Sequence, residues 1–124
     1  MQYTHSSLRQ IRSLRDEAPE PLVDMSPGTA QNLGISKGDW ISVETPYKKS
    51  ERVRFRVNIL EGLSSHVIAV DSQWWYPERE TPDHGCFESN INMIIQGDVY
   101  DPIYGSINIR SIPCRIYKEE QPNL

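Results

Sequence analysis

The chain has 124 residues, of which 37% are hydrophobic and 24% are charged, enough for one domain with a buried core. Its net charge of −4 gives no electrostatic reason to bind nucleic acid or an anionic membrane. No apolar run is long enough for membrane insertion, and the N-terminus lacks the apolar core of a signal peptide, so the sequence predicts a soluble domain of unknown compartment. The two cysteines could form one disulfide, although nothing in their spacing requires it.

Residues 6–17 form the first predicted helix, with Ser6 or Ser7 as its cap. Its apolar residues fall three apart, as on one side of a helix: Leu8, Ile11 and Leu14. A parallel stripe is basic: Arg9, Arg12 and Arg15. We interpret this stripe mainly as a solvated helix face. A phosphate contact is the alternative, because arginine suits bidentate anion binding.

A second helix is predicted to begin at Ser26-Pro27, because serine is a common N-cap and proline suits the first helical position. Gly34 is its expected C-cap. The residues expected to face inward are Ala30, Leu33 and then Ile35.

Alternating hydrophobicity predicts strands over residues 40–45 and 52–59. Their expected inward residues are Ile41, Val43, Val53, Phe55, Val57 and Ile59. Residues 67–70 are apolar on both faces, which indicates a strand in the middle of a covered sheet. Residues 93–95 form a short buried run, and two more alternating stretches at 107–109 and 112–117 place Cys114 inward, with a bend near Pro113. About six short strands and one or two helices predict a compact β-barrel.

The stretch from Trp74 to Met93 has no helical or strand periodicity, and it holds two of the three tryptophans. A loop of this length is usually functional or disordered, and its aromatic content argues against disorder. We interpret it as an ordered loop over a polar, planar ligand, because Glu88 to Asn92 offer donors and acceptors in alternation. The alternative, which residue types alone favour, is a loop that caps an open end of the barrel.

The same loop carries the only candidates for catalysis, and none forms a recognisable catalytic or metal-binding set. Cys86 with His84 could act as a nucleophile pair or as part of a metal site, but the spacing matches no structural zinc pattern. The flanking acids form no acid–base pair: Glu78, Glu80, Asp83 and Glu88. The sequence therefore predicts a binding module or part of a larger enzyme, with no catalytic and no metal-ligating residue. A small hydrolase that uses Cys86 is a distant third interpretation.

Residues 25–44, MSPGTAQNLGISKGDWISVE, resemble the start of the molybdopterin dinucleotide-binding domain. That domain is the C-terminal domain of the dimethyl sulfoxide reductase and formate dehydrogenase superfamily. Further pieces agree in the same order: Tyr3-Thr4-His5-Ser6, Gly62, Trp74-Trp75-Tyr76-Pro77-Glu78 and Glu88-Ser89-Asn90-Ile91-Asn92. Together they cover nearly the whole chain. It departs from the family's pattern at Ser26 and at Asp83-His84-Gly85-Cys86.

The resemblance implies a mainly β fold, a six-stranded double-psi β-barrel with one or two short helices. Residues 1–124 then form a single domain, with a helical lead-in at 1–24, the barrel at 25–118 and a tail at 119–124. It also implies the cofactor molybdopterin guanine dinucleotide, whose dithiolene sulfurs hold molybdenum or tungsten in the intact enzyme. None is expected in the isolated chain.

The same resemblance implies which residues approach the cofactor. His5 and Ser6 are expected near its pterin and phosphate end, and Trp75 with residues 89–92 on the pterin side. The cofactor-binding candidates are therefore His5, Ser6, Trp75, Ser89, Asn90 and Asn92. Amides and hydroxyls can bond to the edges of pterin or guanine while a ring packs on a face.

The resulting hypothesis is the C-terminal domain or small subunit of a molybdenum or tungsten oxidoreductase, which binds and orients the dinucleotide while the cofactor supplies the redox chemistry. The alternative is a stand-alone double-psi barrel that acts as a non-enzymatic interaction or assembly module. Whether the chain is itself an enzyme stays open, because it carries no redox centre. The expected partners are the remaining domains or subunits. The residues that select substrate, metal and redox partner lie elsewhere.

Overall fold

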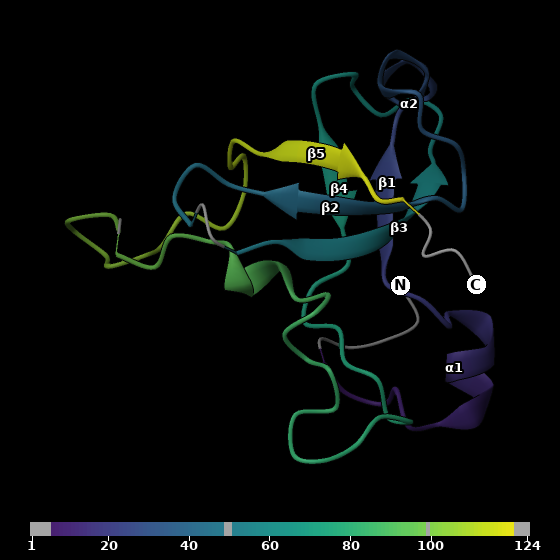
Figure 1. Ribbon diagram of the computed structural model, residues 1–124. Helices are drawn as coiled ribbons and strands as arrows, with labels where there is room; N and C mark the ends of the chain where they lie inside the picture. The colour runs from purple at the N-terminus through teal and green to yellow at the C-terminus, as the bar shows by residue number, and fades with distance from the viewer. Residues whose placement is uncertain (1–5, 49–50, 99, 121–124) are drawn as a thin grey trace.

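The computed structural model describes residues 6–48, 51–98 and 100–120, which form a mainly β chain with two short α-helices (Figure 1). The elements in chain order are α1 (Arg12–Glu17), β1 (Leu22–Met25), α2 (Pro27–Leu33), β2 (Trp40–Glu44), β3 (Val53–Ile59), β4 (Ile68–Val70), the 3₁₀ helix η1 (Ile91–Met93) and β5 (Arg115–Lys118). Across the described ranges, no helix is both long enough and apolar enough to traverse a membrane.

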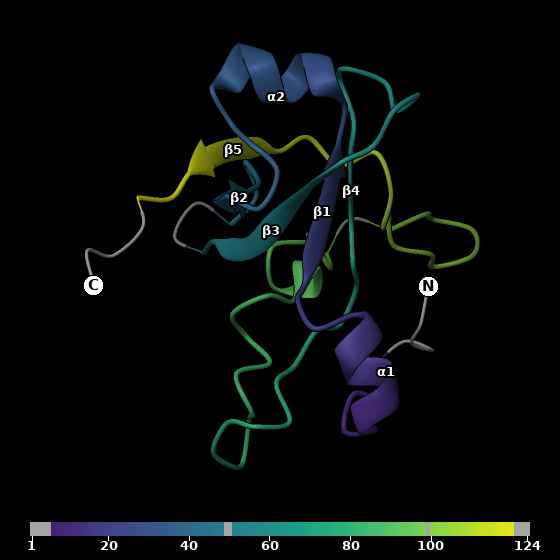
Figure 2. The same cartoon turned by 90° about the vertical axis from the view of Figure 1, so that its right-hand side faces the viewer.

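The five strands form one sheet in the order β4-β1-β3-β2-β5. β1 and β3 are parallel, and the other neighbouring strands are antiparallel. β1 and β4 run across the direction of β2, β3 and β5, so the sheet is strongly curved (Figure 1). Helices α1 and α2 lie at opposite ends of it (Figure 2).

The sheet contains a strand that the sequence did not predict. β1 lies mostly inside the stretch expected to be a helical lead-in, yet Val23 pairs with Val57 of β3 and with Val70 of β4. Val23 and Met25 are fully buried. The sheet therefore begins before residue 25. The strand is only four residues long and follows two nearby prolines, so its alternation is too short to stand out from an extended linker.

Two predicted strands differ from those observed. Residues 107–109 form no strand: Ile107 makes one isolated bridge to Tyr100, and Ile109 is exposed. Residues 67–70 give the edge strand β4 rather than a central one, and Val67 is exposed. The apolar residues on both faces of 67–70 therefore do not indicate a central, covered strand in this chain. β5 forms close to its predicted place, but Cys114 lies before it and is exposed, and neither cysteine is in a disulfide.

The predicted inward faces of β2 and β3 are confirmed. The buried core is built from both strands, β1, α2 and the segment after η1: Val23, Met25, Ala30, Ile35, Ile41, Val43, Val53, Phe55, Val57 and Ile94. The predicted buried run at 93–95 is also present, since Ile94 and Ile95 are buried. Strict alternation located these strands because one face of each packs against the core.

The arginines next to and on the outer face of β3 are paired with acids. Arg52 contacts Glu44 at 2.9 Å, and Arg54 contacts Glu88 at 3.3 Å. Arg56 contacts Glu20. These three arginines of β3 and its approach are therefore neutralised by neighbouring acids and offer no general anion-binding surface.

Helix α2 forms as its caps predict. The Ser26 hydroxyl accepts a hydrogen bond from the Thr29 amide at 3.1 Å, and Gly34 ends the helix with φ of +65°. Ala30 and Ile35 are buried as expected, but Leu33 is exposed. The local signals thus predicted the ends of the helix correctly and its buried side only in part.

Replacing Ser26 by alanine is expected to lower the free energy of unfolding by about 1 kcal/mol, because the Thr29 amide loses its acceptor. Urea unfolding followed by circular dichroism measures this loss. Ser13→Ala, at an exposed position in α1, is the matched control and should stay within about 0.5 kcal/mol of the parent. Equal values for both variants would show that the Ser26 cap contributes nothing.

Asp71 follows β4 and makes stability depend on pH. Burial raises the pKa of its carboxyl group and the neighbouring Asp24 charge adds to this, against the opposing Leu22 amide and Arg9. The folded state therefore binds the Asp71 proton more tightly than the unfolded state does. Stability from this group is present at acid pH and is lost as pH rises through the raised pKa.

Asp71→Asn should accordingly stabilise the chain at neutral pH. The side-chain oxygen of asparagine can still accept the hydrogen bond from the Leu22 backbone N–H, 3.2 Å from the carboxylate in the parent, and it carries no charge. The advantage should shrink in acid, where the parent carboxyl group is protonated. Urea unfolding of both proteins across this pH range gives the comparison. A variant that is less stable than the parent at neutral pH would contradict the expectation.

Candidate functional site

The N-terminal segment, residues 6–21, packs on the loop from Trp74 to Met93, here called the Trp74 loop. This contact corrects the prediction that the arginines of the first helix form a solvated face. The Arg9 guanidinium lies 4.5 Å from the Trp74 ring centroid and the residue is only 2% exposed. The Arg15 guanidinium lies 5.1 Å from the same centroid and pairs with Glu78 at 2.9 Å. Only Arg12 fits the predicted solvated face, and the phosphate contact has no support because the other two stack on an aromatic ring.

The helix itself is also shorter than predicted. It begins at Arg12, with Ile11 as an N-cap that makes no side-chain hydrogen bond, so neither Ser6 nor Ser7 caps it. Leu8 is exposed, and Leu14 packs against the Trp74 and Tyr76 cluster. Contact with Trp74, which sequence periodicity does not reveal, therefore decides which side of α1 is covered.

The long loop from Trp74 to Met93 is held by contacts within itself. The Tyr76 amide donates to the His84 carbonyl at 2.9 Å, and the Tyr76 and Ser89 hydroxyls lie 3.1 Å apart. Arg79 stacks 3.9 Å from the Tyr76 ring centroid and pairs with Glu88. The prediction of an ordered loop rather than a disordered one is confirmed.

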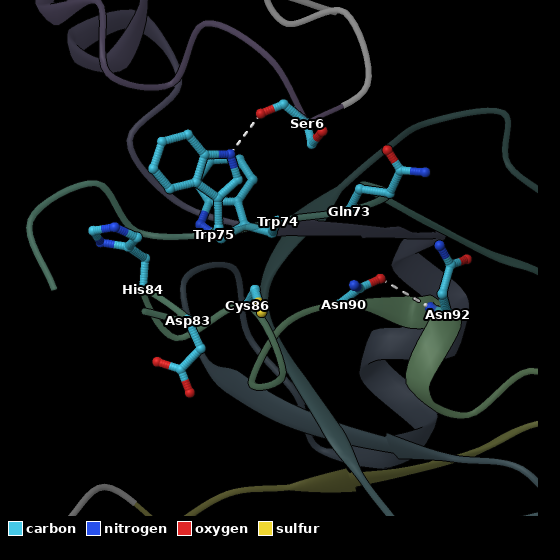
Figure 3. Close-up of a pocket in the computed structure, with 9 residues that line it drawn as sticks. All are labelled: Ser6, Gln73, Trp74, Trp75, Asp83, His84, Cys86, Asn90 and Asn92. Atoms are coloured by element: carbon cyan, nitrogen blue, oxygen red, sulfur yellow. Dashed lines mark hydrogen bonds between the residues drawn. The ribbon is translucent and has the colours of Figure 1, made fainter. Parts of the chain in front are cut away.

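This loop, together with Ser6 and Gln73 outside it, lines an open hollow of about 350 Å³, here called the Trp75 concavity (Figure 3). Within the loop, the lining comes from its first residues, from its middle and from the stretch at η1. The lining residues are Ser6, Gln73, Trp74, Trp75, Asp83, His84, Cys86, Asn90 and Asn92. Segments more than eighty residues apart in the sequence thus meet around one hollow.

Hydrogen bonds fix the orientation of several lining groups (Figure 3). The Trp75 indole nitrogen donates to the Ser6 carbonyl at 2.5 Å, so the ring is held and its N–H is used. The His84 ring packs edge-on against Trp75, 5.7 Å between centroids, and its Nδ1 donates to the Arg79 carbonyl at 2.6 Å. The Asn90 side-chain oxygen accepts from the Asn92 amide at 3.1 Å, which leaves the Asn90 NH₂ group to donate.

Four of the six sequence-predicted cofactor residues lie together in this concavity: Ser6, Trp75, Asn90 and Asn92. Ser89 does not reach it, because its side chain is fully buried against Tyr76. His5 lies outside the described residues. The cofactor-binding role of all six residues stays a prediction.

The sequence did not assign Gln73, Asp83, His84 and Cys86 to this hollow. Gln73 and His84 both have positive φ, 54° and 47°, so the backbone turns sharply at each. His84 and Cys86 therefore do not lie on an extended segment. The sequence does place these residues in or next to the loop that contains Trp75. The direction of their side chains depends on the backbone turns, which the sequence pattern does not reveal.

The lining set fits an uncharged heterocycle better than a phosphate. It holds amides, a hydroxyl, indole rings and one carboxylate, and neither lysine nor arginine is among its described members. Amides match the donor and acceptor edges of a pterin or guanine, and a ring such as Trp75 can pack on a face. Pyrophosphate would need cationic groups or helix N-termini from elsewhere.

A second, larger hollow of about 580 Å³ lies beside Glu44, Arg52 and Arg115. Its charged groups already satisfy one another. The Glu44 carboxylate accepts from the Tyr117 hydroxyl at 2.5 Å and from Arg52 at 2.9 Å, and these bonds lower the pKa of Glu44. This hollow therefore offers less unused hydrogen-bonding capacity than the Trp75 concavity.

The purified chain is expected to carry no stoichiometric iron, zinc, molybdenum or tungsten and to show no visible absorption. Within the described ranges, no group of three or more histidine, cysteine or acidic side chains is placed to hold a metal ion. Elemental analysis by mass spectrometry is the measurement. Tight stoichiometric zinc would redirect attention to His84 and Cys86, which both line the Trp75 concavity.

Comparisons with known proteins agree with the sequence resemblance. The family model described as "Molydopterin dinucleotide binding domain" matches residues 1–113. The chain is 36% identical over 121 residues to a dopamine dehydroxylase of Eggerthella lenta, covering 98% of this chain and 12% of that protein. It is 32% identical over 120 residues to an acetylene hydratase of Syntrophotalea acetylenica, covering 91% of this chain and 16% of that protein.

A solved structure shows the same fold. The acetylene hydratase from Pelobacter acetylenicus superposes with a TM-score of 0.85 and 31% identity, over 94% of this chain and 17% of that one. The chain thus spans between about an eighth and a sixth of the length of these relatives. The resemblance inferred from the sequence is confirmed, and the chain belongs to the molybdopterin dinucleotide-binding domain family.

Proposed function

We propose that this chain holds a molybdopterin guanine dinucleotide in the Trp75 concavity, as one domain or a small subunit of a larger molybdenum or tungsten oxidoreductase. The observation that carries the proposal is the meeting of Ser6, Trp75 and Asn92 around one hollow, although Ser6 lies more than eighty residues before Asn92 and the other two lie near opposite ends of the long loop. A loop that merely caps a barrel end would not require the asparagine segment to reach Ser6. The cofactor, when bound, supplies the redox chemistry, and this chain supplies binding and orientation.

The chemistry of the concavity supports binding of one heterocyclic end of the cofactor. Trp75 offers a ring whose position Ser6 fixes, and Asn90 and Asn92 offer amides. These groups can orient a planar ring by its edges and exclude water from one of its faces. Because the lining holds Asp83 and neither lysine nor arginine, we assign the phosphates of the dinucleotide to another part of the protein.

The size of the concavity supports the proposal of further domains or subunits. Its volume of about 350 Å³ is at the low end for a small-molecule pocket, and it is open on one side. A dinucleotide is too large to be enclosed there. The remaining domains or subunits of the oxidoreductase would then complete the site, as the greater length of the relatives suggests.

We also propose that the curved sheet is part of a six-stranded double-psi β-barrel. The parallel pair β1 and β3 within an otherwise antiparallel sheet supports this, as does its curvature. The edge strands β4 and β5 have only three and four residues, and unpaired edges are commonly closed or covered. An experimental structure in which no sixth strand pairs with β4 or β5 would remove this proposal.

The test of the cofactor site uses the oxidoreductase purified whole from its native source. Asn92→Ala and Trp75→Ala should each lower cofactor content, because each removes a group from the concavity. Losing one amide hydrogen bond should weaken cofactor binding by up to about tenfold. Guanine nucleotide released by acid hydrolysis, measured per mole of chain together with metal content, gives the readout.

The matched control is Asn32→Ala, since Asn32 is an exposed asparagine in α2 and does not line the concavity. It should retain the cofactor content of the parent. Unchanged content in the double variant of Trp75 and Asn92 would exclude the Trp75 concavity as the site. Equal losses in the control would show that the assay reports folding rather than binding.

A further inference from the structure

Residues 100–107, here called the 100–107 hairpin, present large apolar side chains to solvent. An isolated bridge joins Tyr100 and Ile107 at its base. At its tip, Ile103 is 80% exposed and Tyr104 is 85% exposed. The hairpin projects from the sheet in both views (Figures 1 and 2). Clustered apolar side chains in this position commonly mark an interaction site.

The hairpin is ordered by its own hydrogen bonds. The Asp101 amide donates to the Ser106 carbonyl at 2.8 Å, and the Gly105 amide donates to the Asp101 carbonyl at 2.8 Å. The Asp101 side chain accepts from the amides of Ile103 and Tyr104 at 3.0 and 2.8 Å. The tip therefore keeps its shape without a covering partner. A surface organised in advance loses less conformational entropy on binding.

The hairpin carries almost no charge of its own. Asp101 is the only acidic or basic residue within it, and its side chain accepts hydrogen bonds from both tip amides. The groups left for a partner are one isoleucine and one tyrosine at the tip. Tyrosine is enriched in the buried parts of interfaces, where charged residues are depleted. The chemistry that matches this tip is an apolar pocket with an acceptor or donor for the Tyr104 hydroxyl.

We infer that the 100–107 hairpin docks into such a pocket on the remainder of the oxidoreductase, an inference that rests on the proposed function. The lengths of the relatives favour this occupant over a second copy of the chain. The alignments cover 12% of the dopamine dehydroxylase and 17% of the acetylene hydratase structure, so more than four-fifths of each lies outside this domain. That large remainder can supply the pocket.

Docking there would also support the asparagine side of the Trp75 concavity. The hairpin follows closely after Asn90 and Asn92, with the buried residues Ile94 and Ile95 between them. The Ile94 carbonyl is held by the Thr45 hydroxyl at 2.6 Å. Ile94 and Ile95 are therefore fixed in the core between the Trp75 concavity and the hairpin. A partner that holds the hairpin would restrain the chain on the other side of these two residues.

Hydroxyl-radical footprinting of the 124-residue chain and of the whole oxidoreductase tests the inference. Labelling of Tyr104 should fall about fivefold in the whole protein, because a side chain in an interface core is desolvated. Phe55, which is fully buried, should be unlabelled in both samples and controls for unfolding. Equal labelling of Tyr104 in the two samples, or protection in the isolated chain through self-association, would overturn the inference.

A variant separates docking from folding. Ile103→Ser combined with Tyr104→Ser should leave the unfolding midpoint of the isolated chain unchanged, because both side chains are exposed there. The same pair should lower the melting temperature of the whole oxidoreductase, and an unchanged value would contradict docking. In the whole oxidoreductase, Asn92→Ala should lower cofactor content but leave the protection of Tyr104 from labelling unchanged. Failure of the cofactor-site proposal can therefore be told apart from failure of the docking proposal.

Discussion

Replacing Phe55 by alanine is expected to lower the free energy of unfolding by about 3–5 kcal/mol, the largest effect of any substitution proposed for the sheet. Phe55 is fully buried in the middle of β3, where it pairs with Ile41 of β2. Truncation removes the transfer free energy of the ring and leaves a cavity in a close-packed core. Urea unfolding with an unchanged m-value gives the measurement.

The choice of control depends on the structure. The alternating pattern predicts that Arg54→Ala, on the opposite face, changes stability by at most about 0.5 kcal/mol. In the structure the Arg54 guanidinium lies 4.3 Å from the Trp40 ring centroid and pairs with Glu88, so a loss of about 1 kcal/mol is now expected. Arg12→Ala, whose side chain is 94% exposed, is the better neutral control. A Phe55→Ala loss no larger than that of Arg12→Ala would show that the inward face of β3 is wrongly assigned.

Trp74→Ala is expected to have a comparable effect, about 3–5 kcal/mol, for a different reason. Trp74 is 1% exposed and is the common contact of the N-terminal segment and the long loop. Arg9 and Arg15 stack on its ring, and Tyr76 meets it edge-on at 6.4 Å between centroids. Its removal should both open a cavity and detach α1 from the loop.

Two measurements separate these effects. Urea unfolding gives the total loss, and limited proteolysis of the segment before β1 reports detachment of α1. Trp75→Ala is the matched control, because Trp75 is the neighbouring tryptophan but is only partly buried. If Trp74→Ala proved no more destabilising than Trp75→Ala, Trp74 would not be the anchor of this end of the chain.

How far the sequence predicts the fold depends on whether a signal is local. The Ser26 cap, the Gly34 end and the alternation of β3 are local, and the structure has all three. β1 was missed because four residues carry too little periodicity, and its place is decided by pairing with β3 and β4. The stripe containing Arg9 was misjudged because its partner, Trp74, lies more than sixty residues away.

The candidate site shows the same division. The family resemblance predicts cofactor contacts for Trp75, Asn90 and Asn92, and these three residues line one concavity. The resemblance predicts the same for Ser89, but its hydroxyl lies against Tyr76 in the interior, a direction that a one-dimensional pattern does not encode. Asp83 and His84 enter the lining through turns of the loop backbone, which tertiary contacts such as the one between Tyr76 and His84 determine.

An experimental structure of the cofactor-loaded oxidoreductase is the most direct test of the central claim, that the Trp75 concavity holds one heterocyclic end of the dinucleotide. The claim predicts a pterin or guanine ring against Trp75, with its edge within hydrogen-bonding distance of the Asn90 or Asn92 amide and no phosphate in the concavity. A dinucleotide that contacts this chain only elsewhere, for example beside Glu44 and Arg115, would contradict it.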